Sequence, residues 1–302
     1  MDKNDVIKLL DAYNVRMAEI YNDMIVSSDL PLNLELNRMG SVEKIVNQKM
    51  IEWMKHYKSG LGSSNFYDYL RNTIDPETAY KFVVYASSIC DDGVPSIFIH
   101  LLDRHKATLE KQIMNYVIEI DWENHNIADS YADDKITSVA ALLNTLSEWR
   151  LTCNLEPLIL KYSRNHYPYD IISDAFKNIV IQSPEADNTI IINELRRMLN
   201  KHDDLSLSGE NLLISLVEKN KGRQLDDVYE CLLRCFEEMS NKQIAIICFA
   251  DLGDNRAIQD LRAWLLSDSD DNIDSVLVKE AVSSLKRLGD QTGDLEARYA
   301  QP

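Results

Sequence analysis

The sequence predicts an all-α protein built from stacked helix pairs, and three observations support this fold class. Apolar residues recur at helical spacing through most of the 302 residues. Runs of alternating apolar and polar residues are short, so strand signals are nearly absent. The tripeptide Leu252-Gly253-Asp254 returns as Leu288-Gly289-Asp290, 36 residues later, at the end of a similar apolar pattern. Self-similarity at this period is typical of repeat architectures.

The first predicted helices cover residues 4–26 and 42–58. Seven apolar residues, from Val6 to Met24, form one stripe along the first of them. Gly40 and Ser41 are expected to break the chain between the two helices. Residues 59–62, with two glycines, are expected to end the second helix.

A clear helix start follows at Asp75-Pro76-Glu77, because it combines an N-cap, a proline at the first position and an acid near the positive helix end. Residues 93–95 start the next helix in a similar way, and further helices are expected over 109–121 and 136–149. Twelve of the fourteen tyrosines lie at or before Tyr169, and the repeat is indistinct there. Residues 1–135 are therefore predicted to be an N-terminal helical region of irregular helix pairs or a cap.

Residues 136–302 divide into regular helix pairs. The pairs are predicted over 155–164 with 168–181, 188–199 with 207–219, 224–239 with 241–252, and 255–267 with 274–288. The second helix of each pair carries its apolar residues at one register, which starts at 142, 175, 212, 245 and 281. The spacings of 33, 37, 33 and 36 residues carry the argument, since any amphipathic helix shows the internal pattern.

The last two pairs resemble HEAT repeats. Their second helices match residue by residue, since Ala245, Ile246, Phe249 and Leu252 superpose on Ala281, Val282, Leu285 and Leu288. The resemblance covers about 244–290 and extends more weakly to about 136. It implies a right-handed α-α superhelix of HEAT-like helix pairs, an armadillo-type α-solenoid, over 136–302. It also implies a binding scaffold, because such arrays hold partners and the fold itself contains no chemistry.

The formal net charge is −17, with −8 over residues 1–150 and −9 over residues 151–302. A field of this sign repels nucleic acid and anionic membranes and favours cationic partners. An ordinary solvated surface is the plainer explanation. No secretory signal or bilayer-length apolar stretch is visible, and five cysteines favour reduced thiols. The sequence therefore predicts a cytoplasmic location, no nucleic acid partner and no membrane partner.

The candidate partner-binding residues are Glu148, Glu218 and Asp251. Each lies six residues after a register start, where Ile181 and Arg287 occupy the other two positions. In a solenoid, the second helix of each pair lines the concave surface that usually binds. Three acids there would form a broken negative stripe. The alternative is an ordinary polar helix face.

Motifs for chemistry are weak, so no catalytic, metal or cofactor site is predicted. The acidic turn 268–274 resembles half of a calcium loop, but Ile273 and Lys279 stand where Gly and Glu are needed. The thiols of Cys231, Cys235 and Cys248 lack the spacing and the histidine of a zinc site, which favours burial. The six histidines are scattered, and the paired acids lie near helix starts that explain them.

The sequence thus predicts a non-enzymatic protein-binding scaffold whose acidic surface accepts a basic protein or peptide. A narrower version is an immunity-type inhibitor that covers a basic toxin domain. One alternative is an enzyme or nucleic-acid-handling protein with a site in the concave surface. Another is a structural subunit that self-associates through its tyrosine-rich half. The sequence leaves the oligomeric state open.

Overall fold

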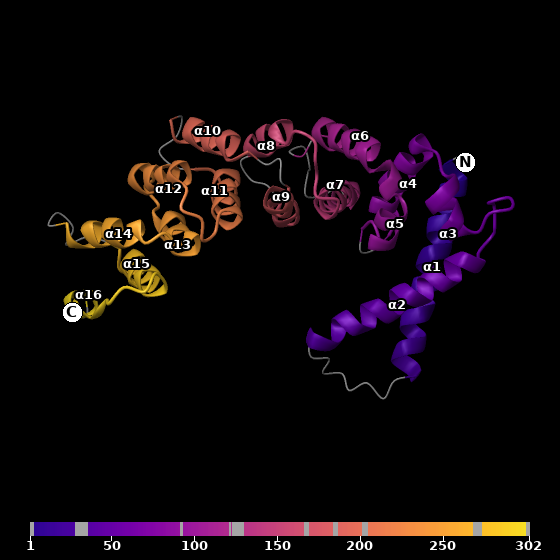
Figure 1. The fold of residues 1–302 in the computed structure, drawn as a ribbon, viewed down its shortest axis with the longest axis horizontal. Helices are drawn as coiled ribbons and strands as arrows, with labels where there is room; N and C mark the ends of the chain where they lie inside the picture. The colour runs from indigo at the N-terminus through magenta and orange to yellow at the C-terminus, as the bar shows by residue number, and fades with distance from the viewer. Residues whose placement is uncertain are drawn as a thin grey trace. The chain divides into compact units, whose positions relative to one another are not determined.

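The protein is all-α, as the sequence predicts. The computed structural model describes residues 3–27, 36–90, 93–120, 122, 130–165, 169–183, 187–200, 205–267 and 274–299. Every regular element among these residues is a helix (Figure 1). None of the helices described combines the length and the apolar character that crossing a bilayer requires.

The chain forms two compact units, Met1–Cys153 and Asn154–Pro302. The packing of α7 (Ser130–Glu148) accounts for the position of this division. That helix packs on α4 (Pro76–Ile89) and α6 (Lys106–Glu119) of the first unit. The indole of Trp149 also donates to the carbonyl of Ile99, at 3.3 Å.

The first unit is built around an aromatic core. Phe98 lies 4.5 Å from Tyr13 and 4.9 Å from Phe82, measured between ring centroids, and Phe66 packs on both phenylalanines. The remaining elements of this unit are α1 (Lys3–Ser27), α2 (Leu36–His56), α3 (Phe66–Asp68), the π-helical η1 (Tyr69–Thr73), α5 (Ser96–Leu101) and the 3-10 helix η2 (Asp103–His105).

The predicted break at Gly40 and Ser41 is wrong, since α2 begins at Leu36 and runs through both residues. One glycine inside a helix costs only about 1 kcal/mol, which the burial of Val46 and Met50 on the same helix can offset.

The predicted helix start at Asp75 is confirmed. Its carboxylate accepts from the backbone N–H of Thr78 at 3.0 Å and from the Thr78 hydroxyl at 2.7 Å. These bonds lower the pKa of Asp75 below its ordinary value, because they favour the charged form.

The second unit consists of two rows of helices that stack on one another (Figure 1). In one row α9, α11, α13 and α15 each pack on the next, and in the other row α8 packs on α10 and α10 on α12. The rows are joined because α10 packs on α11, α12 on α13 and α14 on α15. The helices are α8 (Glu156–Ser163), α9 (Asp170–Gln182), α10 (Asn188–Leu199), α11 (Leu207–Lys219), α12 (Asp226–Glu238), α13 (Gln243–Leu252), α14 (Arg256–Leu266), α15 (Ser275–Arg287) and α16 (Gly293–Tyr299).

The repeated Leu-Gly-Asp tripeptide has the same structural role twice. Gly253 and Gly289 adopt φ angles of 73° and 90°, a left-handed conformation that ends a helix and favours glycine. The aspartate that follows each glycine then binds an arginine, because Asp254 pairs with Arg256 and Asp290 with Arg262. The sequence repeat therefore encodes a helix stop and an anchor for a guanidinium group.

Candidate functional site

The row formed by α9, α11, α13 and α15 leaves one stripe of each helix unburied. We call these four stripes together the second-helix face. Within each helix its members recur at intervals of three, four or seven residues, the spacings of one helical face. Two ion pairs connect stripes of neighbouring helices, Lys177 with Glu218 and Asp251 with Arg287, so the connected stripes lie on the same side of the row. The main members are Ile171, Asp174, Lys177, Ile181, Leu207, Ile214, Glu218, Ile244, Ile247, Asp251, Val276, Glu280 and Arg287.

Several apolar side chains on the second-helix face are not buried. Leu207 keeps 41% of its area exposed and Val276 keeps 54%. Between them, Ile214 of α11 and Ile244 and Ile247 of α13 are only half-buried. We call these three residues the isoleucine patch. Single exposed apolar residues are ordinary, and these three are of interest because they lie on two helices that pack together.

Two of the three predicted acids border the isoleucine patch. Glu218 lies one helical turn after Ile214, and Asp251 lies one turn after Ile247, on helices that pack together. Each acid also has a basic neighbour on the next helix of the row, on α9 for Glu218 and on α15 for Asp251. The Lys177 ammonium lies 3.8 Å from the Glu218 carboxylate, and the Arg287 guanidinium binds Asp251. These pairs are partly exposed, so each contributes only about 0–1 kcal/mol to stability and can be exchanged for other contacts.

The third predicted acid, Glu148, belongs to the first unit and ends α7. Its carboxylate lies 3.8 Å from the His100 imidazole and accepts from the Ser96 hydroxyl at 3.4 Å. The structure therefore brings Glu218 and Asp251 onto neighbouring helices, while Glu148 lies in a different unit.

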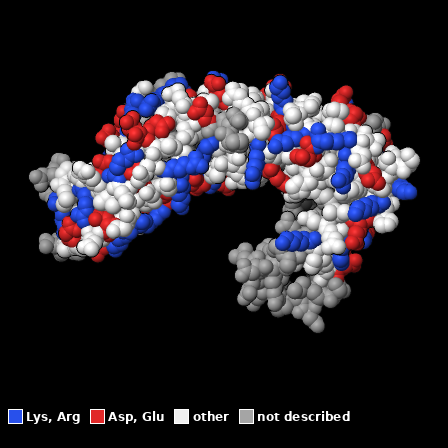
Figure 2. Space-filling view, viewed as in Figure 1, with Lys and Arg blue, Asp and Glu red and all other residues white. Residues whose placement is uncertain are grey.

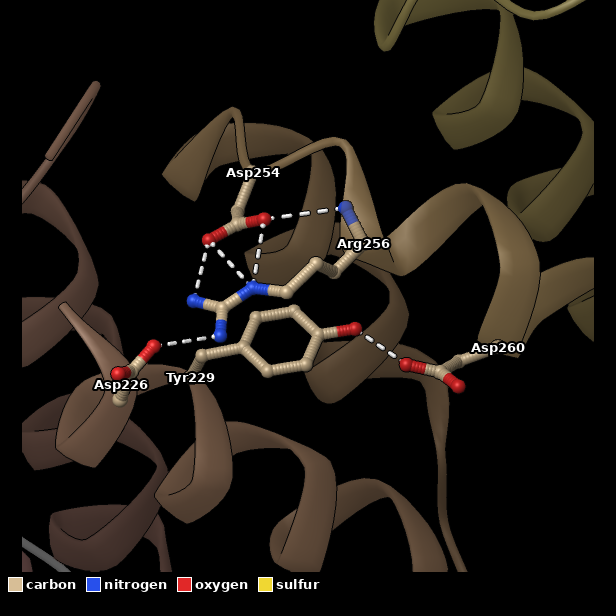
Figure 3. A network of polar contacts seen from close by, with 5 residues as sticks. All are labelled: Asp226, Tyr229, Asp254, Arg256 and Asp260. Carbon is tan, nitrogen blue, oxygen red and sulfur yellow. Dashed lines mark hydrogen bonds and ion pairs between the residues drawn. The ribbon is translucent and has the colours of Figure 1, made fainter. Parts of the chain in front are cut away.

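Beside this row, a polar network fixes α12 to the start of α14 (Figure 3). The Arg256 guanidinium donates to both carboxylate oxygens of Asp254, at 2.7–3.1 Å, and to Asp226 at 2.7 Å. The same guanidinium lies 4.2 Å from the centre of the Tyr229 ring. The Tyr229 hydroxyl donates to Asp260, and burial together with this carboxylate raises the tyrosine pKa far above its ordinary value.

Every polar group in this network has a partner within it, and Asp254 is buried with only 3% of its area exposed. The Arg256 hydrogen bond lowers the pKa of Asp254, so the carboxylate stays ionised. We assign the network a structural role, because its polar groups pair with one another and join α12 to α14.

The three thiols at Cys231, Cys235 and Cys248 are buried in the core, as the sequence predicts. A hydrogen bond with Cys231 and burial raise the pKa of Cys235, and burial raises that of Cys248. The same hydrogen bond lowers the pKa of Cys231. Cys235 and Cys248 are therefore neutral thiols, which are poor nucleophiles and poor metal ligands. Within the described ranges, the structure shows no group of His, Cys, Asp and Glu that could hold a metal ion.

Most of the acidic turn with half a calcium-loop pattern, residues 268–273, lies outside the described residues, as do His125, His166 and His202. Asp274, the last residue of this turn, is the N-cap of α15, and its carboxylate accepts a hydrogen bond from the Val276 backbone N–H at 2.8 Å.

A further acidic surface, which the sequence analysis missed, lies on α12. Asp and Glu side chains gather over this helix in the view of Figure 2. These acids lie on one side of an amphipathic helix, at spacings that include three, four and seven residues, and this pattern is the signal that could have revealed them. The exposed acids of α12 are Asp226, Asp227, Glu230, Glu237 and Glu238.

Comparison with protein-family models, curated proteins and solved structures finds no match to this chain.

Proposed function

We propose that this chain is a non-enzymatic scaffold that binds a basic protein or peptide on the second-helix face. The observation that carries the proposal is the isoleucine patch bordered by Glu218 and Asp251 on two packed helices. Apolar groups at the centre supply binding energy, and carboxylates at the border select cationic groups and accelerate their encounter. The net charge of −17 adds a long-range attraction for such a partner.

The partner that fits this surface is an amphipathic segment with apolar and basic residues. Its apolar side chains would cover Ile214, Ile244 and Ile247. Its lysines or arginines would replace Lys177 and Arg287 at the two carboxylates, an exchange that costs little because those pairs are exposed. A cytoplasmic HEAT-like solenoid with a right-handed superhelical twist is the architecture that we propose for this role. An immunity-type inhibitor of a basic toxin is a narrower form of it.

The proposal is tested with a fluorescein-labelled helical peptide of leucine and lysine, by fluorescence anisotropy with the full chain. We expect Glu218→Gln with Asp251→Asn to weaken binding about 5- to 30-fold, which corresponds to about 1–2 kcal/mol. Ile214→Ser with Ile247→Ser should weaken it similarly, but with less dependence on salt.

A matched control removes the same charge elsewhere in the same unit. Glu230→Gln with Glu237→Gln neutralises two exposed acids of α12, and binding should change less than about twofold. Equal losses in both double variants would show that only the net charge matters. A larger loss in the control would move the site to α12, and either result rejects the second-helix face.

A further inference from the structure

The first unit holds two cations beside one tyrosine ring, where the end of α2 meets α3 and η1. The ammonium nitrogen of Lys55 lies 5.3 Å from the centre of the Tyr67 ring, and the guanidinium carbon of Arg71 lies 5.8 Å from the same point. A guanidinium nitrogen of Arg71 also donates to the Tyr67 hydroxyl oxygen at 3.0 Å. We call Lys55, Tyr67 and Arg71 the Tyr67 cluster.

Hydrogen bonds of the backbone fix the elements that carry this cluster. The N–H of Phe66 donates to the carbonyl of Tyr57 at 2.8 Å, so the chain returns to the end of α2 as α3 begins. Arg71 belongs to the π-helical η1, and the carbonyl of Ile74 just after it accepts from the Arg104 guanidinium at 2.6 Å. Short π-helical turns are rare in proteins and occur frequently at functional sites.

Both cations of the Tyr67 cluster retain hydrogen-bond donors that no described residue uses. Lys55 and Arg71 are exposed, and within the described ranges neither pairs with a carboxylate. Asp68, the residue after Tyr67, accepts instead from the side-chain amide of Asn65 at 2.8 Å. Because the Tyr67 oxygen already accepts from Arg71, its own proton can be donated to a ligand. An ammonium, a guanidinium and a phenol therefore offer donors around one ring.

These donors match the chemistry of a phosphate group. Two positive charges at one ring repel each other, and a bound anion relieves this repulsion. A phosphate monoester carries a charge of about −1.5 to −2 at pH 7 and three acceptor oxygens, one for each donor group. Arginine binds phosphate through two parallel hydrogen bonds, and lysine adds a compact charge on a flexible stem. A carboxylate offers one charge and two oxygens, so it matches the cluster less well.

We propose that the Tyr67 cluster binds a phosphate monoester, carried by a small molecule or by a phosphorylated side chain of a partner. The net charge of −17 opposes any anion at long range, so the site depends on these short contacts. It is independent of the protein-binding function proposed above, because the second-helix face belongs to the other unit.

Titration of the full chain with methyl phosphate, dimethyl phosphate and acetate, followed by isothermal calorimetry, tests the proposal. We expect methyl phosphate to bind at least about fivefold more tightly than the two singly charged anions. No binding of methyl phosphate at millimolar concentration, or equal affinity for acetate, would overturn the proposal. Equal affinity for dimethyl phosphate would indicate a diester, such as a nucleic acid backbone, and would also overturn it.

Variants at exposed positions locate the site. Lys55→Gln and Arg71→Gln should each weaken methyl phosphate binding at least about fivefold, since each removes a charge together with its donors. Lys55→Arg keeps the charge, and its affinity should stay within about twofold of that of the unmodified chain. Lys49→Gln removes an exposed lysine of the same helix outside the cluster, and should also stay within about twofold. If both cluster variants bind methyl phosphate as tightly as Lys49→Gln does, the site is rejected.

Two larger monoesters distinguish the sources of the phosphate group. Tighter binding of a phosphoserine peptide with otherwise neutral residues indicates a phosphorylated partner, and tighter binding of glycerol phosphate indicates a small molecule. Both results support the monoester site. Failure of all the monoesters to bind would exclude it, whatever happens to the leucine–lysine peptide at the second-helix face.

Discussion

Replacing Arg256 with alanine should destabilise the second unit locally, at the junction of α12, α13 and α14. The substitution removes the fork of hydrogen bonds to Asp254, the contact with Asp226 and the guanidinium above the Tyr229 ring. Asp254 is buried, and it would keep only the bond from the backbone N–H of residue 256, at 3.0 Å.

The magnitude follows from these contacts. A hydrogen bond to a charged group contributes about 1.5–3 kcal/mol. The stacked guanidinium adds about 0.5–1 kcal/mol. The Asp226 contact adds little, because that carboxylate is 84% exposed. Since the Arg256 side chain is itself 42% exposed, we expect the substitution to lower the free energy of local unfolding by about 2–3 kcal/mol, less than the full sum of these contributions. Arg256→Lys keeps the charge but not the fork, and should lose about half as much.

Hydrogen exchange followed by mass spectrometry on peptides from α13 and α14 measures this loss directly. A change of 2–3 kcal/mol corresponds to exchange about 30- to 150-fold faster through local opening. Arg223→Ala removes an exposed arginine between α11 and α12, and serves as the control with an expected effect below about 0.5 kcal/mol. If Arg256→Ala exchanges no faster than Arg223→Ala, the network does not hold the junction together.

The pH dependence gives the same prediction an independent test. Arg256 lowers the pKa of Asp254 below the ordinary value of 3.8. A carboxylate with a lowered pKa stabilises the folded state at pH values above its ordinary pKa, and this stabilisation is lost as the pH falls through the folded pKa. The difference between the unmodified chain and Arg256→Ala should therefore be complete at neutral pH and should shrink below about pH 4. A difference that stays constant into acid would mean that the Asp254 charge is not involved.

Three further predictions concern other parts of the structure. Gly93→Ala should destabilise the first unit by about 1–3 kcal/mol more than Gly60→Ala, as measured by urea unfolding. Both glycines have positive φ angles, but only at Gly93 would the new methyl group lie 2.8 Å from the side chain of Ala141, so equal losses would contradict this prediction. Glu194→Ala should cost the second unit about 2–4 kcal/mol in the same assay, because the buried carboxylate accepts bonds from Ser163 and Arg197; a loss below about 1 kcal/mol would show that solvent replaces these partners. Labelling the native chain with iodoacetamide should modify the half-exposed Cys153 before the buried Cys231, Cys235 and Cys248, as peptide mass spectrometry can show; comparable rates for all four would contradict the packing of α12 and α13.

The helices of the second unit could be predicted closely, because local signals define their ends. The expected helix over 207–219 matches α11, and the expected 274–288 differs from α15 by one residue at each end. Gly289 and Asp274 fix the ends of α15 by backbone and side-chain geometry that is encoded locally.

The helices of the first unit could be predicted less closely, because contacts between residues distant in the sequence determine where some of them form. The short α3 and the π-helical η1 carry no periodic signal, and Phe66 is held there by Phe82 and Phe98, far along the chain. The break expected near Gly40 failed for the same reason, since a local preference of about 1 kcal/mol is smaller than the burial of one helix face.

Some features of the candidate site could also be predicted from the sequence, and others depend on packing between helices. The register of the repeat places Glu218 and Asp251 on the neighbouring helices α11 and α13. Their partners Lys177 and Arg287 depend on the offset between helices, which no single helix encodes. The Tyr67 cluster of the first unit also combines separate segments, so a linear pattern could not reveal it.

The stacking of the second unit has a consequence for how it folds. Among the described residues of the second unit, each substantial contact between helices joins two helices that are at most three apart in chain order, such as α8 and α11. Such topology keeps loop-closure entropy small and allows structure to spread from any helix pair to the next. We therefore expect the second unit to fold fast and to open pair by pair. Damage at one junction, such as the loss of Arg256, should then remain confined to α12–α15 while α8–α11 keep their native protection.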